Sequence, residues 1–163
     1  MKDLMIPIGK GMTWSEELKY VLRSWDKYAD IGKVFLVGTG LKERYSWLKN
    51  VKIIECDDPF NRNKDGNIIR KIIKSRDTGE LSDPFIRSSD DQYLLKRIED
   101  FSPVYSVNLK EKESNWWRMG SRWKNRLKRT YRVLFVKGKT TFNYDVHFPM
   151  EVSHDFKKIM ESY

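Results

Sequence analysis

The sequence predicts an α/β fold, with a mostly parallel sheet and helices on both of its faces. Short apolar runs at 4–8, 33–37, 51–54 and 84–86 have the length and composition of strands. Longer segments with helical periodicity separate these runs, and strands that alternate with helices favour a parallel sheet. A chain of 163 residues is long enough for one domain with a core and short for two.

The first strand leads into Gly9-Lys10-Gly11, a turn in which the backbone can approach a ligand closely. Thr13 and Glu16 form a capping box that predicts the start of a helix reaching Tyr28. A short helical piece is expected at 45–48, before the third strand. The next helix is predicted to end near Gly79, and its apolar face comprises Ile68, Ile69, Ile72 and Ile73.

After Pro103 the character of the sequence changes. An apolar stripe predicts a helix of about four turns, and its members are Trp116, Met119, Trp123 and Leu127. A last strand is expected at 140–146. Ser153 then caps a predicted terminal helix whose apolar positions are Phe156, Ile159 and Met160.

The net charge of +9 is concentrated in one segment. Residues 116–132 contain seven basic residues and no acidic one. This concentration indicates a polyanionic partner. The single cysteine, Cys56, excludes a disulfide framework and a cysteine-based zinc site. No apolar run is long enough to span a bilayer, so the expected location is the cytoplasm, or the host cytoplasm if a phage encodes the chain.

Asp90 and Asp91 are the first candidates for chemistry, because they follow the predicted strand at 84–86. Ligands of parallel sheets bind at the carboxyl ends of the strands. Two adjacent carboxylates beside a core need a cation, and Mg²⁺ or Mn²⁺ would complete its shell with water and substrate phosphates. The apolar Tyr93-Leu94-Leu95 that follows favours a site near the core. The alternative is that Ser88-Ser89-Asp90-Asp91 is a turn or a helix N-cap.

His147 is the second candidate, as a further metal ligand or a general base. The alternative for His147 is a histidine that is hydrogen-bonded within a loop. Two segments are candidate contacts for a nucleotide, namely Gly9-Lys10-Gly11 and the region that contains Asn63, Lys64, Asn67 and Arg70. Lys64 and Arg70 lie near a predicted helix N-terminus, which favours an anion, or they are solvated surface charges.

The basic segment has three interpretations. It binds nucleic acid through cations and stacking aromatics, it lies on an anionic membrane, or it is a surface helix with its aromatics in the core. For nucleic acid, the candidate residues are Trp116, Trp117, Arg118, Arg122, Lys124, Arg126 and Arg129.

The ordered set of motifs resembles the core of the Stealth-type sugar-phosphate transferases and related glycosyltransferases of the GT-A type. The motifs that carry this resemblance are Trp14–Tyr28, Lys33–Gly38, Trp47–Val51, Asn67–Ile73, Ser89–Leu95 and His147–Pro149. Two positions depart from the family pattern. Gly9-Lys10-Gly11 replaces an Asp-Gly signature, and Ser89-Asp90-Asp91 replaces Asn-Asp-Asp.

The resemblance implies a GT-A-like single domain over 1–163, a nucleotide-sugar donor and a divalent metal, either Mn²⁺ or Mg²⁺. It assigns 4–100 to the donor and metal core, 103–139 to a variable acceptor side, and 140–163 to a closing strand and helix. Asp90, Asp91 and His147 would hold the metal, and Asp91 and His147 are the catalytic candidates.

The basic acceptor side leads to the hypothesis that the acceptor is modified cytosine in phage DNA, namely hydroxymethylcytosine that receives glucose or arabinose. A second hypothesis places the same enzyme at a membrane surface, where it builds polysaccharide. A third is a nucleic-acid-binding module without catalysis.

Overall fold

The computed structural model describes residues 1–11, 15–61, 63–102, 105–108, 125, 128–129, 142–144 and 149–153. The chain divides into two compact units. One unit comprises Met1–Ser102 with Pro149–Tyr163, and the other comprises Pro103–Phe148. The division at Pro103 coincides with the change in sequence character. The functional division of a single domain into core, acceptor side and closing segment remains a prediction.

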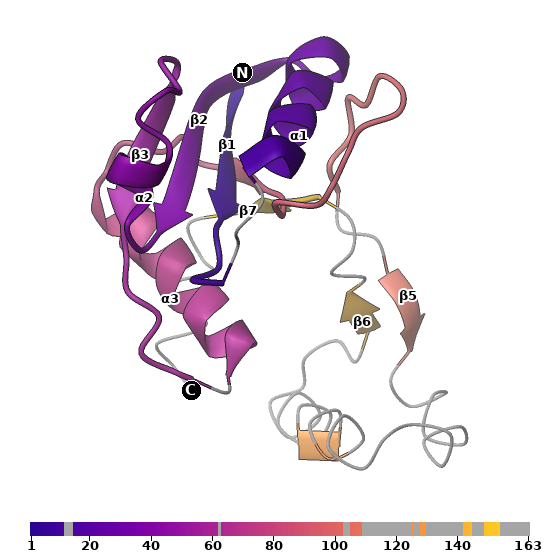
Figure 1. The fold of residues 1–163 in the computed structure, drawn as a ribbon. Coiled ribbons are helices and arrows are strands. Elements are labelled where there is room, and N and C mark those ends of the chain that lie inside the picture. The colour runs from indigo at the N-terminus through magenta and orange to yellow at the C-terminus, as the bar shows by residue number, and fades with distance from the viewer. Residues whose placement is uncertain are drawn as a thin grey trace. The chain divides into compact units, whose positions relative to one another are not determined.

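The first unit has a five-stranded sheet in the order β3-β2-β1-β4-β7. Its strands are β1 (Lys2–Pro7), β2 (Ile31–Gly38), β3 (Val51–Glu55), β4 (Phe85–Arg87) and β7 (Met150–Val152). The first four are parallel, and β7 is antiparallel to β4. This confirms the prediction of an α/β fold with a mostly parallel sheet. The arrowheads of β1, β2 and β3 point to one edge, which we call the carboxyl edge (Figure 1).

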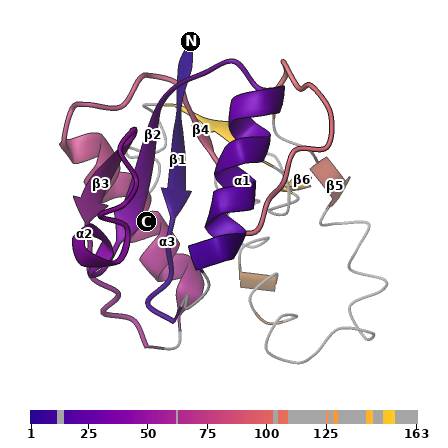
Figure 2. The same ribbon diagram turned by 45° about the horizontal axis from the view of Figure 1, so that its top comes forward.

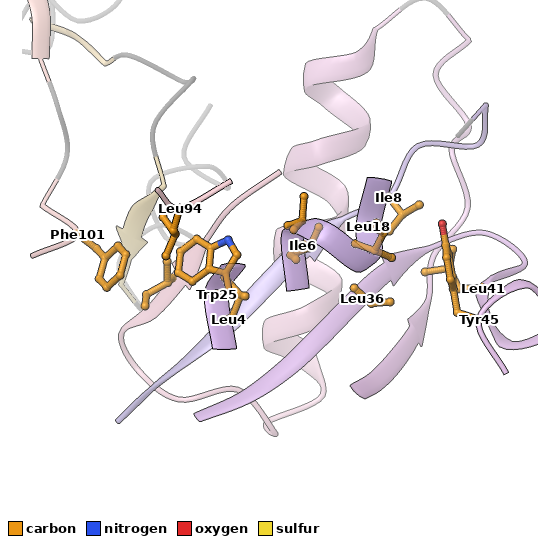
Figure 3. Packing of buried hydrophobic residues seen from close by; sticks show 12 residues of the cluster. Leu4, Ile6, Ile8, Leu18, Trp25, Leu36, Leu41, Tyr45, Leu94 and Phe101 are labelled. Atoms are coloured by element: carbon orange, nitrogen blue, oxygen red, sulfur yellow. The ribbon is translucent and has the colours of Figure 1, made fainter. Parts of the chain in front are cut away.

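Helix α1 (Ser15–Tyr28) contributes to one core cluster, together with every second residue of β1. Leu4 and Ile6 pack in this cluster with Leu18 and Trp25, which are fully buried (Figure 3). The Trp25 ring stacks on Phe101 with 5.5 Å between the ring centroids. The predicted helix to Tyr28 is confirmed, and Figure 2 shows α1 lying alongside β1.

Helix α3 (Lys64–Asp77) contributes to a second core cluster with the alternate residues of the strands, such as Met5 and Phe35. The helix itself was predicted, and of its predicted apolar face Ile72 is buried and Ile68 packs against the cluster. The residues buried in α3 are Lys71, Ile72 and Ser75, whereas Ile69 and Ile73 are only half-buried. The helix is therefore rotated so that a lysine faces the interior, and ion pairing explains this orientation.

Helix α2 (Leu41–Arg44) lies earlier than the helical piece predicted at 45–48. A tertiary contact explains the shift. The Glu55 carboxylate, at the end of β3, accepts hydrogen bonds from the backbone amides of Gly40, Leu41 and Lys42 at 2.8–3.0 Å. These amides open the helix and need acceptors. A glutamate ten or more residues away supplies them, and local sequence patterns do not record such a partner.

The second unit contains a two-stranded antiparallel sheet of β5 (Tyr105–Asn108) and β6 (Phe142–Tyr144). Strand β6 lies within the strand predicted at 140–146, whereas β5 and β7 were not predicted. The helix expected from Trp116 to Leu127 and the terminal helix after Ser153 fall largely or wholly outside the described residues. Among the helices that the structure describes, none is long and apolar enough to cross a membrane.

Candidate active site at the carboxyl edge

The strand order places β1 between β2 and β4, so the chain leaves β1 toward one side and returns on the other. A parallel sheet has its ligand crevice at such a switch point, outside the carboxyl ends of the strands. The loop after β1 contains Gly9-Lys10-Gly11, and the loop after β4 contains Asp90-Asp91. Two of the segments that the sequence singled out therefore follow neighbouring strands at this point.

Asp90 and Asp91 occupy a tight turn that directly follows the buried strand β4. The Gln92 side-chain oxygen closes this turn by accepting hydrogen bonds from the Ser89 amide at 2.8 Å and the Ser88 hydroxyl at 2.9 Å. The Ser88 amide in turn donates to the Met5 carbonyl of β1 at 3.0 Å. The local structure is thus a turn, and no helix follows it in the described residues up to Ser102.

The two carboxylates of the turn have different surroundings. Asp90 is half-buried, and its pKa is raised mainly by burial, with smaller contributions from the charges of Asp91 and Glu17. Asp91 is exposed and accepts a hydrogen bond from the Ser89 hydroxyl at 2.5 Å. A carboxylate whose charge is disfavoured by burial and by like charges is a group that a bound cation would stabilise.

The apolar run predicted after the turn is only partly buried. Leu94 is buried in the α1 cluster, whereas Tyr93 is 42% exposed and Leu95 is 87% exposed. The Tyr93 hydroxyl donates to the Glu17 carboxylate at 3.3 Å. The chain after the turn therefore crosses the surface near α1, with Leu94 in the core cluster and Tyr93 and Leu95 exposed.

Two buried cations lie in the neighbourhood of the turn. Arg87, the last residue of β4, is 9% exposed, and burial lowers its pKa while the charges of Asp91 and Asp90 oppose this effect. Lys71 on α3 is 2% exposed, and its charge lowers the pKa of Asp90. The carboxyl edge therefore combines carboxylates and buried cations, as sites for phosphorylated ligands do.

Lys71 joins three segments of the carboxyl edge. Its ammonium group donates a hydrogen bond to the Ile8 carbonyl at 2.8 Å and lies 2.6 Å from the Asp58 carboxylate. The other oxygen of Asp58 accepts a hydrogen bond from the Lys10 amide at 3.2 Å. The sequence did not reveal Lys71 or Asp58 as site residues, since a lysine in a helix and an aspartate before a proline are common on protein surfaces.

The nucleotide candidates on α3 have local structural partners. The Asn63 side chain caps α3 by accepting from the Gly66 amide at 3.0 Å. Asn67 bonds both the amide and the carbonyl of Phe60 at 3.1 Å. Arg70 donates to the Asp57 carboxylate at 2.8 Å, which lowers the pKa of that carboxyl, and Lys64 is exposed.

A groove of about 450 Å³ runs along the outer face of α3. It is lined by Phe60, Asn63, Gly66, Ile69, Arg70, Ile73, Lys74 and Asp77. Asn63 and Arg70 thus belong to this groove, and neither Asp90 nor Asp91 lines it. Gly9–Gly11 and the acidic turn thus follow neighbouring strands of the sheet, whereas Asn63 and Arg70 line the groove on α3.

Most of the remaining candidates lie outside the described residues. These are His147 and the nucleic-acid candidates Trp116, Trp117, Arg118, Arg122, Lys124 and Arg126. Arg129 is described and is exposed. Among the described residues, no group of three or more histidine, cysteine, aspartate or glutamate side chains forms a metal cluster. The acidic turn therefore offers two carboxylates, which fits Mg²⁺ or Mn²⁺ when substrate phosphates complete the shell.

Comparison with known proteins finds no relative for this chain: no protein-family model, no curated protein and no solved structure matches it.

Proposed function

We propose that this chain is a GT-A-like glycosyltransferase that binds a nucleotide-sugar donor at the switch point between β1 and β4. The observation that carries the proposal is that Asp90-Asp91 follows β4 and the glycine-containing loop follows the neighbouring parallel strand β1. Backbone amides of a glycine-containing loop suit a diphosphate, and paired carboxylates suit the metal that such a diphosphate brings. The packing of α1 and α3 in separate core clusters is in keeping with this architecture.

In this proposal Asp90 and Asp91 hold a divalent metal, Mn²⁺ or Mg²⁺, with His147 as a third candidate ligand. The metal would supply positive charge that stabilises the diphosphate as it leaves the sugar. Asp91 is exposed and accepts a hydrogen bond from Ser89, so its carboxylate can also contact substrate. Gly9, Lys10 and Gly11 would contact the phosphates, because an added Cβ at either glycine meets no atom within 4 Å and the loop is open.

A screen of nucleotide sugars by thermal unfolding, with and without Mn²⁺, tests the donor and metal together. We expect at least one nucleotide sugar to raise the unfolding midpoint only when Mn²⁺ is present. Asp91→Asn should remove this stabilisation, whereas Asp26→Asn, at an exposed position on α1, should retain it. Stabilisation that is equal in wild type and Asp91→Asn would contradict the proposal.

For the acceptor, we propose duplex DNA that contains hydroxymethylcytosine. The support is the basic, tryptophan-rich sequence at 116–132, since cations bind phosphates and aromatics can hold an unstacked base. Transfer of a radiolabelled sugar to hydroxymethylcytosine DNA is the direct assay, with unmodified DNA as the matched control. Transfer to a membrane-bound or glycan acceptor instead would favour polysaccharide synthesis. Salt-sensitive DNA binding that survives Asp91→Asn, without any transfer, would favour a non-catalytic binding module.

A further inference from the structure

We propose that Lys71 and Asp58 are positioning residues that hold the Gly9–Gly11 loop in the shape that receives the donor diphosphate. The inference rests on the proposed function for its ligand, but its structural part concerns the loop alone. Neither residue was singled out by the sequence, and neither is needed in the metal site. Their side chains are 3% and 9% exposed, so they act through the loop and do not touch substrate.

The contacts form a chain from α3 to the loop. The Lys71 ammonium donates to the carbonyl of Ile8, the residue that precedes Gly9, at 2.8 Å. It also forms an ion pair with Asp58 Oδ1 at 2.6 Å. Asp58 Oδ2 accepts from the Lys10 amide at 3.2 Å. One ion pair thus anchors backbone atoms on both sides of Gly9.

The burial of this pair indicates a role besides stability. Buried ion pairs cost desolvation, and apolar residues of similar volume stabilise a core at least as well. The Lys71–Asp58 pair, however, makes hydrogen bonds to the backbone of Ile8 and Lys10, just after the end of β1. Gly9 and Gly11 carry no side chains that could anchor the loop, and an added Cβ at either would meet no atom within 4 Å. The ion pair provides the anchoring that the loop itself lacks.

The pair also sets the charge beside the proposed phosphate site. Asp58 neutralises Lys71 locally, so the pair as a whole adds little net charge. Loss of the pair would therefore act on the diphosphate mainly through the shape of the loop. The expected consequence is weaker binding of the diphosphate group, with little change for the nucleoside part.

Hydrogen exchange of the backbone amides tests the positioning role without any ligand. The variants are Lys71→Met, Asp58→Ala and the double variant, which removes both charges and avoids a lone buried ion. We expect exchange at Lys10, whose amide bonds Asp58, to become at least about tenfold faster, as loss of a charge-assisted hydrogen bond predicts. Amides of β1 from Leu4 to Ile6 report any loss of global stability, and exchange at Lys10 should rise in the double variant by more than such a loss accounts for. The control is Lys74→Met, the same substitution at an exposed position on α3.

Calorimetric titration with UDP, GDP and CDP in the presence of Mn²⁺ tests the ligand part. For the nucleotide that wild type binds best, we expect about tenfold weaker binding by the double variant and unchanged binding by Lys74→Met. The corresponding nucleoside should bind equally to all variants. Unchanged exchange at Lys10 would overturn the positioning role, whichever nucleotide binds. If exchange rises but wild type binds none of the three diphosphates, the diphosphate assignment fails together with the proposed function, and the loop contact stands.

Discussion

Two ion pairs join the same loop to the same helix, yet they lie in opposite environments. Asp57 pairs with Arg70 at the surface, where the side chains are 64% and 49% exposed. Asp58 pairs with Lys71 one residue further along each segment, where the exposed fractions fall to 9% and 3%. The chemistry is alike in both pairs, and only the direction of the side chains differs.

Burial decides what the loss of one charge does to the fold in these two pairs. Water and salt screen the outer pair, so its loss leaves each partner solvated. The side chains of the inner pair are shielded from water, and their charges are balanced mainly by each other. Loss of one partner therefore leaves the other charge buried without compensation. The same contrast divides the carboxyl edge into a packed part, which includes Gly38 and Lys71, and an open part, which includes Gly11 and Asp91.

The largest effect is expected from Lys71→Met, which should lower the free energy of unfolding by about 3–5 kcal/mol because Asp58 remains buried and unpaired. The Lys71→Met/Asp58→Ala variant should recover part of this loss, since no lone charge remains. Urea unfolding monitored by tryptophan fluorescence measures both. Equal stability of Lys71→Met and wild type would mean that water reaches Asp58 readily.

Glycine substitutions separate the packed part of the edge from the open part. A Cβ added at Gly38 would lie 2.6 Å from the backbone oxygen of Ile8, so Gly38→Ala should cost about 1–3 kcal/mol of unfolding free energy. Gly11→Ala is the matched substitution, because a Cβ there meets nothing within 4 Å. Its unfolding midpoint should equal that of wild type. A similar loss in both variants would show that the Gly11 backbone needs glycine for another reason.

Asp90→Asn tests whether the half-buried, ionised Asp90 carboxylate lowers the free energy of unfolding. The pKa of Asp90 is raised in the folded state, so folding becomes more favourable as pH falls through that pKa. The gain is complete below the pKa of the unfolded state, which is about 3.9. At neutral pH we therefore expect Asp90→Asn to unfold at a higher urea concentration than wild type, and the difference should vanish at low pH. Wild type that is equally stable or more stable at neutral pH would contradict this expectation.

The smallest effect is expected from Arg70→Met in the exposed pair. The hydrogen bond from Arg70 lowers the pKa of Asp57, so the pair stabilises the fold at high pH and loses this contribution as pH falls through the folded-state pKa. Removal of Arg70 should return the pKa of Asp57 toward its ordinary value, as NMR titration of the carboxyl carbon would detect. The urea midpoint should barely change, and a loss as large as that of Lys71→Met would refute the comparison.

The periodicity of apolar residues predicted most of the first unit. Short continuous apolar runs indicated β1 to β4, because strands covered on both faces are apolar throughout. Helical spacing from Leu18 to Tyr28 indicated α1, because burial of one helix face imposes that period on the sequence. The position of Asp90-Asp91 after a buried strand followed from the same reasoning. The edge strand β7 (Met150–Val152) lacked a signal, since it follows Pro149 and has the charged Glu151 between its two apolar residues.

What tertiary structure alone decided is the environment of individual polar side chains. The sequence placed Asp57, Asp58, Arg70 and Lys71 in a loop and a helix but could not separate the outer pair from the inner one. Both pairs have the same spacing along the chain, and their difference arises from the rotation of α3 against the sheet. That rotation also directed Lys71 to the end of β1. A charge becomes part of a site through its partners and its distance from water, and both are set by packing between segments that the sequence keeps far apart.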